Sequence, residues 1–400
     1  MKKIAKLSLV AAVAVAGLTS ANAQPLEEAI KNVDVSGSVV YRYNDYRNDV
    51  TGAANPTSNN NNYKVGVNLS SKVNEDVKFN SRFIVGQPSA NGGAAGADGD
   101  NGFATLDSSV NGDQGVDVTL SHAYFGYTGI ANTTVNVGKQ GLTTPWTVAL
   151  DSDSNEQTGT GILALSTMGP VTLAGAYFNQ TNLDDSGDVN IGDGSEDIAT
   201  VGAITTLGPV TADAWYLDAQ DIFDTYTIGA KGAFDVSGIK LGADARWVSL
   251  DLDGTNQPDN TMAKIVLTGD AGLVDAKVAY AMTDDEGGLT ALDNDAVTTL
   301  LGWNLTINNK ADADYWQAVL GFDILSNLNL SANYGNVEWT PAANTTREQE
   351  EVYAQLLYKM SKNLTTYVRY GTFTDETSTA GATTEINDDT RGRLQVEYTF

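Results

Sequence analysis

The feature that most constrains this chain is how its β-like segments are joined. From Val33 onward, apolar side chains recur at every second position within successive short segments, which predicts β-strands. Short turns, such as Gly169-Pro170 and Gly208-Pro209, alternate with long connections rich in Asp, Asn, Gly and Thr, such as 87–116. Tight turns at one end and long loops at the other are typical of a membrane-spanning barrel. A soluble β-sandwich does not need its connections sorted in this way.

The number of strands follows from their directions. The 19 candidate segments are 33–43, 62–72, 75–86, 117–127, 133–139, 160–168, 170–178, 198–207, 209–217, 224–234, 239–250, 260–270, 272–282, 295–306, 314–323, 327–338, 349–360, 363–373 and 389–400. A closed antiparallel barrel with both chain ends on one side needs an even number. Segments 272–282 and 314–323 run in opposite directions and share one long connection, so 295–306 lies within it. The sequence predicts an all-β transmembrane antiparallel barrel of 18 strands.

The N-terminal segment has the three parts of a secretory signal peptide. Lys2 and Lys3 precede an apolar run over 7–18, and small residues follow up to Ala23. We expect residues 1–23 to be removed and 24–400 to form one barrel domain. The apolar run is shorter than the roughly 20 residues that a membrane-spanning helix needs.

Composition excludes several classes of function. The formal net charge of −27 makes nucleic acid an improbable partner. With no cysteine and one histidine, the chain has no disulfide framework and hardly any ligands for a transition metal. A hydrophobic content of 42% and a mean hydropathy of −0.21 suit strands that are apolar on one face only.

Charged residues lie on the polar face of several strands. Arg42, Arg82 and Arg246 alternate with apolar neighbours, and a charge that faces lipid at mid-depth costs about 2–4 kcal/mol, so this face should meet water. Closure of the last strand on the first would gather such residues into a basic pore wall, to which we assign Arg42, Lys64, Arg82, Arg246, Arg369, Arg391 and Arg393. The alternative interpretation is that these side chains pair with loop carboxylates and only stabilise the fold.

Several motifs resemble one known family. They are the run from Pro25 to Gly37, Tyr41-Arg42-Tyr43, Gly138-Lys139-Gln140, Thr144-Pro145-Trp146-Thr147 and the aromatic C-terminus at Phe400. Together they resemble the major outer membrane porin family of Campylobacter and its relatives. The resemblance implies a trimeric, water-filled, 18-stranded channel in a Gram-negative outer membrane, with loop 3 folded into the lumen.

The resemblance also implies where the channel is narrowest. Loop 3, at about 140–159, carries Asp151, Asp153 and Glu156, and we expect these acids to face the basic wall across the constriction. The alternative is an outward loop with solvated acids. The expected function is that of a general diffusion porin for small hydrophilic solutes and ions, with a preference for cations. A substrate-specific channel and an adhesin or structural barrel are the competing hypotheses.

Neither catalysis nor a cofactor is expected. His122 lies beside Ser121, but neighbouring residues of a strand point to opposite faces, so the chain should not be an enzyme. Asp184, Asp185 and Asp188 lie in an EF-hand-like run that lacks its closing glutamate, which predicts at most loose binding of a divalent cation such as Ca²⁺. The expected partners are two further copies of the chain, outer-membrane lipids, lipopolysaccharide and the barrel assembly machinery.

Overall fold

The computed structural model describes residues 33–50, 57–86, 102–106, 117–151, 156–184, 192, 194–254 and 257–400. The expected signal peptide at 1–23 lies outside this part of the chain. No helix among the described residues is long and apolar enough to cross a membrane.

The structure consists of β-strands joined by turns and loops. In chain order the strands are β1 (Val33–Asn48), β2 (Thr57–Lys72), β3 (Val77–Gly86), β4 (Ala104–Thr105), β5 (Asp117–Ile130), β6 (Thr133–Gly141), β7 (Thr158–Met168), β8 (Val171–Thr181), β9 (Ile198–Leu207), β10 (Val210–Ala219), β11 (Phe223–Val236), β12 (Ile239–Leu252), β13 (Asp259–Asp270), β14 (Val274–Thr283), β15 (Asp314–Leu325), β16 (Leu328–Ala342), β17 (Thr345–Lys359), β18 (Leu364–Thr379) and β19 (Ala382–Thr399).

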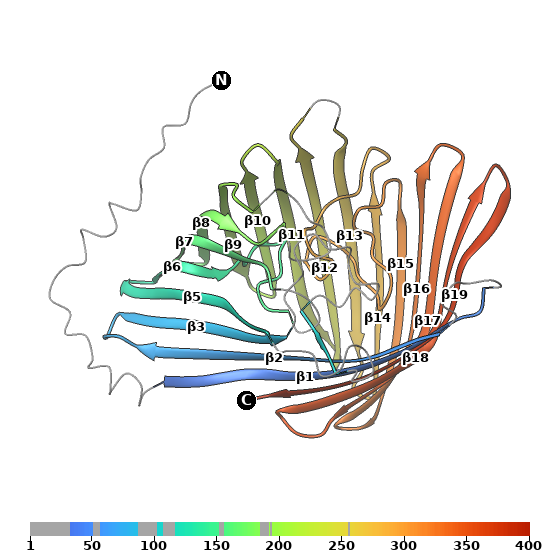
Figure 1. The fold of residues 1–400 in the computed structure, drawn as a ribbon, viewed down its shortest axis with the longest axis horizontal. Helices are drawn as coiled ribbons and strands as arrows, with labels where there is room; N and C mark the ends of the chain where they lie inside the picture. Colours follow the sequence, from blue (N-terminus) through green and yellow to red (C-terminus); the bar gives the residue numbers. More distant parts are fainter. Residues whose placement is uncertain are drawn as a thin grey trace.

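The strands form one closed antiparallel barrel. β1 pairs with β2 on one side and with β19 on the other, from Ser38↔Thr399 to Asn48↔Asp389 (Figure 1). The two-residue strand β4 pairs with β2, whereas β3 pairs directly with β5. The sheet contains 19 strands in all, so its wall without β4 has 18, which confirms the prediction.

Alternate side chains of each strand face opposite sides of the wall. In β15, Trp316 and Leu320 are 51% and 59% exposed, whereas Tyr315 and Gln317 are 0% and 4% exposed. The exposed set is apolar, as a lipid-facing surface requires. The buried set faces the interior of the barrel.

The connections are sorted by length as the sequence predicts. Gly169-Pro170 and Gly208-Pro209 join adjacent strands, and both glycines have positive φ, 60° and 59°, which glycine adopts without strain. At the other end, 142–157 joins β6 to β7 and 284–313 joins β14 to β15. The segment 295–306 is not a barrel strand and has a single isolated bridge, Leu301↔Thr306.

The largest apolar core lies on the inner face of the barrel. Phe178, Leu217 and Val248 come from the wall, while Trp146 and Leu292 come from the connections 142–157 and 284–313. Burial of each such side chain contributes about 1.5–3 kcal/mol. The expectation that the inner face meets water is therefore wrong for this part of the wall, because the long connections cover its apolar residues.

Candidate functional site

Two basic residues of neighbouring strands meet the acidic β6–β7 connection. The guanidinium of Arg82 on β3 contacts the Glu156 carboxylate, with Nη2 at 2.5 Å from Oε1. Lys64 on β2 lies 3.8 Å from the same oxygen and donates to the backbone carbonyl of Asp151 at 2.5 Å. All three side chains are buried, and a buried charge persists only when it is paired and hydrogen-bonded. The contact therefore fixes one end of this connection to the wall.

This arrangement corrects the expected one. The sequence predicts acidic and basic groups that face each other across open space, but Glu156 is in direct contact with Arg82 and Lys64. Asp151 is also buried, at 7% exposed. Asp153 lies outside the described residues. Pairing with loop carboxylates, the alternative interpretation, thus describes Lys64 and Arg82.

A β-bulge brings a further group to Glu156. The register between β3 and β5 shifts after Arg82, which pairs with His122, so Ser121 is the extra residue of β5. The Ser121 hydroxyl donates to Oε2 of Glu156 at 2.9 Å. The sequence predicts that Ser121 and His122 point to opposite faces, but this alternation does not hold here, because a bulge interrupts it. The hydroxyl nevertheless donates to a carboxylate and not to the imidazole.

The seam between the first and last strands carries two more arginines. Arg42 is 1% exposed and donates through Nε and Nη2 to Oε1 of Gln395, at 2.8 and 2.5 Å. Its guanidinium lies 4.8 Å from the Phe103 ring centroid. Arg393 donates to Oδ1 of Asn44 at 2.7 Å. These arginines therefore connect β1 to β19 through amide oxygens.

The other end of the basic wall meets the β14–β15 connection. Arg391 of β19 pairs with Asp389, and its Nη1 donates to Oδ1 of Asn304 at 2.6 Å. The guanidinium groups of Arg369 and Arg393 lie 5.9 and 5.8 Å from the Trp303 ring centroid. The residues 303 and 304 thus sit directly on the arginines of β18 and β19.

The same connection also contacts the adjacent wall strand β13 and the β6–β7 connection. Lys264 of β13 donates to the carbonyl of Thr299 at 2.7 Å, and Leu292 donates its N–H to the carbonyl of Trp146 at 2.9 Å. Gln157 donates from Nε2 to the carbonyl of Leu292 at 3.1 Å. One segment therefore contacts β13, β19 and the β6–β7 connection.

Arg246 belongs to none of these groups. It pairs with Asp213 of β10 through two hydrogen bonds of 2.8 and 3.0 Å and donates to Thr227 of β11 at 3.2 Å. Its partners come from neighbouring strands of a different sector. The seven predicted basic residues therefore fall into three sets: Lys64 and Arg82 on the β6–β7 connection, Arg246 alone, and Arg42, Arg369, Arg391 and Arg393 on β1, β18 and β19.

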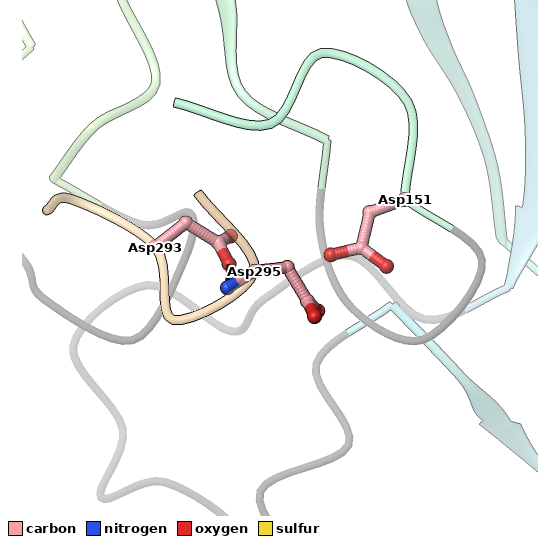
Figure 2. A group of neighbouring side chains, drawn as sticks. All are labelled: Asp151, Asp293 and Asp295. Carbon is pink, nitrogen blue, oxygen red and sulfur yellow. Dashed lines mark hydrogen bonds between the residues drawn. The ribbon is translucent and has the colours of Figure 1, made fainter. Parts of the chain in front are cut away.

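Three carboxylates meet where the two connections touch. Asp151 comes from the β6–β7 connection, and Asp293 and Asp295 come from the β14–β15 connection (Figure 2). One oxygen from each lies within 4.8 Å of the other two. Carboxylate oxygens are hard donors of the kind that bind Ca²⁺ or Mg²⁺. This set could hold such a cation, whereas Asp185 and Asp188 lie outside the described residues.

Lys310 near the end of the β14–β15 connection has an unusual environment. Its ammonium lies 4.9 Å from the Trp339 ring centroid. Burial lowers the pKa of Lys310 to about 8, with a further lowering from the nearby Arg347 and an opposing effect from Asp375. The docked position of the connection therefore favours the neutral amine of Lys310 over its charged ammonium.

Sequence reasoning missed the acceptor that holds the tip of the β14–β15 connection. Glu351 of β17 is 2% exposed and accepts hydrogen bonds from residues 303 and 304. Strand alternation could have identified Glu351 as an inward-facing residue, because it places Glu351 on the same face of β17 as Tyr353. Asp293 and Asp295 gave no comparable signal, since they belong to no strand.

A sequence profile decides which family this is. The profile of the Campylobacter major outer membrane protein matches residues 1–250, which is more than half of the 400-residue chain. The chain belongs to this family. It is therefore an outer-membrane porin of a Gram-negative bacterium. No curated protein matches this porin in sequence.

Solved structures agree with the fold of the porin. OccAB3 of Acinetobacter baumannii superposes with a TM-score of 0.74 at 14% identity, over 92% of this chain and 99% of that one. A BenF-like porin from Pseudomonas fluorescens gives 0.72 at 15% identity, over 92% and 99%. OccK2 (OpdF) of Pseudomonas aeruginosa, solved in complex with glucuronate, gives 0.70 at 12% identity, over 92% and 98%. At these identities the likeness concerns the barrel fold alone.

Proposed function

We propose that this porin is a passive, water-filled pore for small hydrophilic solutes and ions, narrowed by its two long connections. The supporting observation is the contact of 284–313 with β13, with β19 and with 142–157. A segment held by separate parts of a closed wall must cross the space that the wall encloses. Solutes then diffuse past it, and the process needs neither a catalytic residue nor a resident cofactor.

A planar bilayer tests the proposal directly. The full-length mature protein should give discrete current steps that are proportional to voltage. An absence of steps from correctly folded protein would contradict the pore and favour an adhesin or structural barrel.

The proposed ion preference is for cations. Glu156 partly balances Lys64 and Arg82, while Asp151, Asp293 and Asp295 bring three carboxylates together between the connections. Carboxylates that line a pore favour cations. The reversal potential across a KCl gradient should therefore have the sign of K⁺ permeation, and a potential of the opposite sign would overturn this part of the proposal.

A substrate-specific channel is the second candidate. Arg369 is flanked by the rings of Tyr353 and Tyr367, at 5.7 and 4.6 Å, which would suit a ring-shaped solute with a carboxylate. OccK2, with a similar fold, was solved with glucuronate. Saturable block of the current by glucuronate would favour this candidate, and unchanged conductance would favour general diffusion.

We also propose that the porin forms a homotrimer, contacts lipopolysaccharide and other outer-membrane lipids, and is inserted by the barrel assembly machinery. Its exposed apolar outer face supports residence in lipid. Mass measurement of the detergent-solubilised protein by light scattering tests the trimer, and a monomer mass would contradict it.

A further inference from the structure

The β14–β15 connection contains a small hairpin over 300–307. Leu301 and Thr306 form its β-bridge, Gly302 donates its N–H to the carbonyl of Leu305 at 2.7 Å, and Ile307 donates to Leu300 at 3.2 Å. Residues 302–305 form the tip. Leu305 in this tip is fully buried.

Glu351 of the barrel wall holds the hairpin tip. Its Oε1 accepts the backbone N–H of Trp303 at 2.8 Å, and its Oε2 accepts the backbone N–H and the side-chain amide of Asn304 at 2.8 and 3.1 Å. Hydrogen bonds to an ionised acceptor are about twice as strong as neutral ones. One carboxylate therefore binds the tip through three donors.

The fit between the tip and the wall is close. A Cβ on Gly302 would lie 2.1 Å from Oε1 of Glu351 and 2.6 Å from the Tyr315 hydroxyl. Only glycine allows the backbone to approach the carboxylate in this way. Gln317 adds a further contact, since its Nε2 donates to the carbonyl of Leu301 at 2.7 Å.

The Glu351 carboxylate depends on the tip in return. Glu351 is only 2% exposed, and within the described part of the chain its carboxylate forms no ion pair. An ionised carboxylate without water needs hydrogen-bond donors, and here the hairpin supplies three. The wall and the tip thus stabilise each other, which makes the docked position specific.

From these contacts we infer that Glu351 is a positioning residue, which fixes the hairpin tip against Arg369, Arg391 and Arg393 and so sets the bore and ion selectivity of the pore. The tip carries Asn304, which accepts from Arg391 at 2.6 Å, and Trp303, which lies over Arg369 and Arg393. The effect of Glu351 on conduction rests on the proposed function. Its effect on the position of the hairpin tip does not.

The test compares two neighbouring substitutions with the same change of charge. Glu351→Gln replaces an acceptor oxygen with an amide that faces N–H donors, so the tip should leave the wall. Glu350→Gln is the control, because Glu350 lies on the outer face and accepts from the Tyr334 hydroxyl at 2.9 Å. In bilayers, Glu351→Gln should raise the conductance and the current noise, while Glu350→Gln should match the wild type. Equal conductance of all three proteins would overturn the effect on the bore.

A thiol probe follows the tip without any need for conduction. The chain has no cysteine, so Leu305→Cys introduces the only thiol. Its reaction with a water-soluble thiol reagent should be slow when Leu305→Cys is the sole change or is combined with Glu350→Gln. Combination with Glu351→Gln should make the reaction faster by about tenfold or more, as expected from the loss of a charge-assisted hydrogen bond. Equal rates with and without Glu351→Gln would overturn the positioning role, whether or not the protein conducts.

A shorter acid separates position from charge. Glu351→Asp keeps the charge but withdraws the carboxylate by one methylene, so the tip should become reactive, though less than in the Glu351→Gln variant. Full protection of the thiol in the Glu351→Asp variant would show that charge alone matters and would overturn the positioning role.

Discussion

Glu156 is the residue whose setting most changes the expected electrostatics. It contacts Lys64 and Arg82 at 3.8 and 2.5 Å, so one carboxylate partly balances two cations. Removal of one partner from a buried ion pair leaves an uncompensated charge, which costs about 3–5 kcal/mol. The side chain therefore affects both stability and the field inside the pore.

We expect Glu156→Gln to shift the ion preference toward anions. The substitution removes one negative charge and leaves Lys64 and Arg82 in place. The reversal potential in a KCl gradient measures the shift. Glu338→Gln on the exposed outer face is the matched control. A potential unchanged by Glu156→Gln would contradict a location of this carboxylate beside the permeation path.

Lys310 gives a pH dependence with a defined sign. Its pKa is about 8 in the docked connection, below the ordinary 10.5, so between these values the undocked or unfolded form binds more protons. Docking should strengthen as pH rises through this window and be weakest below it. The reaction rate of the thiol introduced by Leu305→Cys, corrected for thiol ionisation, should fall from about pH 8 to about pH 10. The pH dependence should be lost in Lys310→Met, and its persistence there would contradict the assignment.

At the scale of elements, strands were predictable and the docking of connections was not. The alternation in 314–323 located β15, observed over Asp314–Leu325, because a strand's two faces meet different surroundings wherever it pairs. The requirement for an even number of strands correctly excluded the segment 295–306 from the barrel wall. The contact of Trp303 with Glu351, in contrast, joins residues 48 positions apart, and no local pattern encodes it.

Site residues were likewise predictable where strands place them and unpredictable where loops do. Arg369, Arg391 and Arg393 could be placed together because β18 and β19 are sequence neighbours and pair in register, with Arg369 opposite Arg393. Glu156 could not be placed on Arg82, since a loop of 142–157 can adopt many paths. The three-carboxylate cluster was missed for that reason too.

Divalent cations should reveal that cluster. If Asp151, Asp293 and Asp295 bind Ca²⁺, millimolar Ca²⁺ should lower the single-channel K⁺ conductance, and chelation should restore it. The Asp293→Asn and Asp295→Asn double variant should lose the response, whereas Asp185→Asn and Asp188→Asn should keep it. An equal response in every variant would locate the ion elsewhere.

For the whole molecule, closure depends on the contact between the two ends of the wall. Gly37 exchanges two backbone hydrogen bonds with Phe400, of 2.9 and 3.0 Å. A Cβ at Gly37 would lie 2.1 Å from the carbonyl oxygen of Gly66 and 2.9 Å from the Phe400 ring. The barrel seam therefore has no room for a side chain at this position.

We expect Gly37→Val to impair closure of the barrel. The added methyl groups would force β1 away from β2 or from Phe400, and overpacking of this kind costs about 1–3 kcal/mol or more. The fraction of folded, compact protein on unheated gels should fall. Gly175→Val, at a position with nothing within 4 Å of its Cβ, should leave that fraction unchanged. Equal yields from both variants would contradict a tight seam.

The proposed function requires that the β14–β15 connection crosses the barrel and narrows a pore. The most direct measurement is the single-channel conductance of a variant in which residues 286–311 are replaced by a short glycine-rich turn, compared with that of the intact porin. We predict ohmic steps from both proteins and a severalfold larger conductance from the shortened one. Equal conductance of two folded proteins, or no current from either, would contradict this role of the connection.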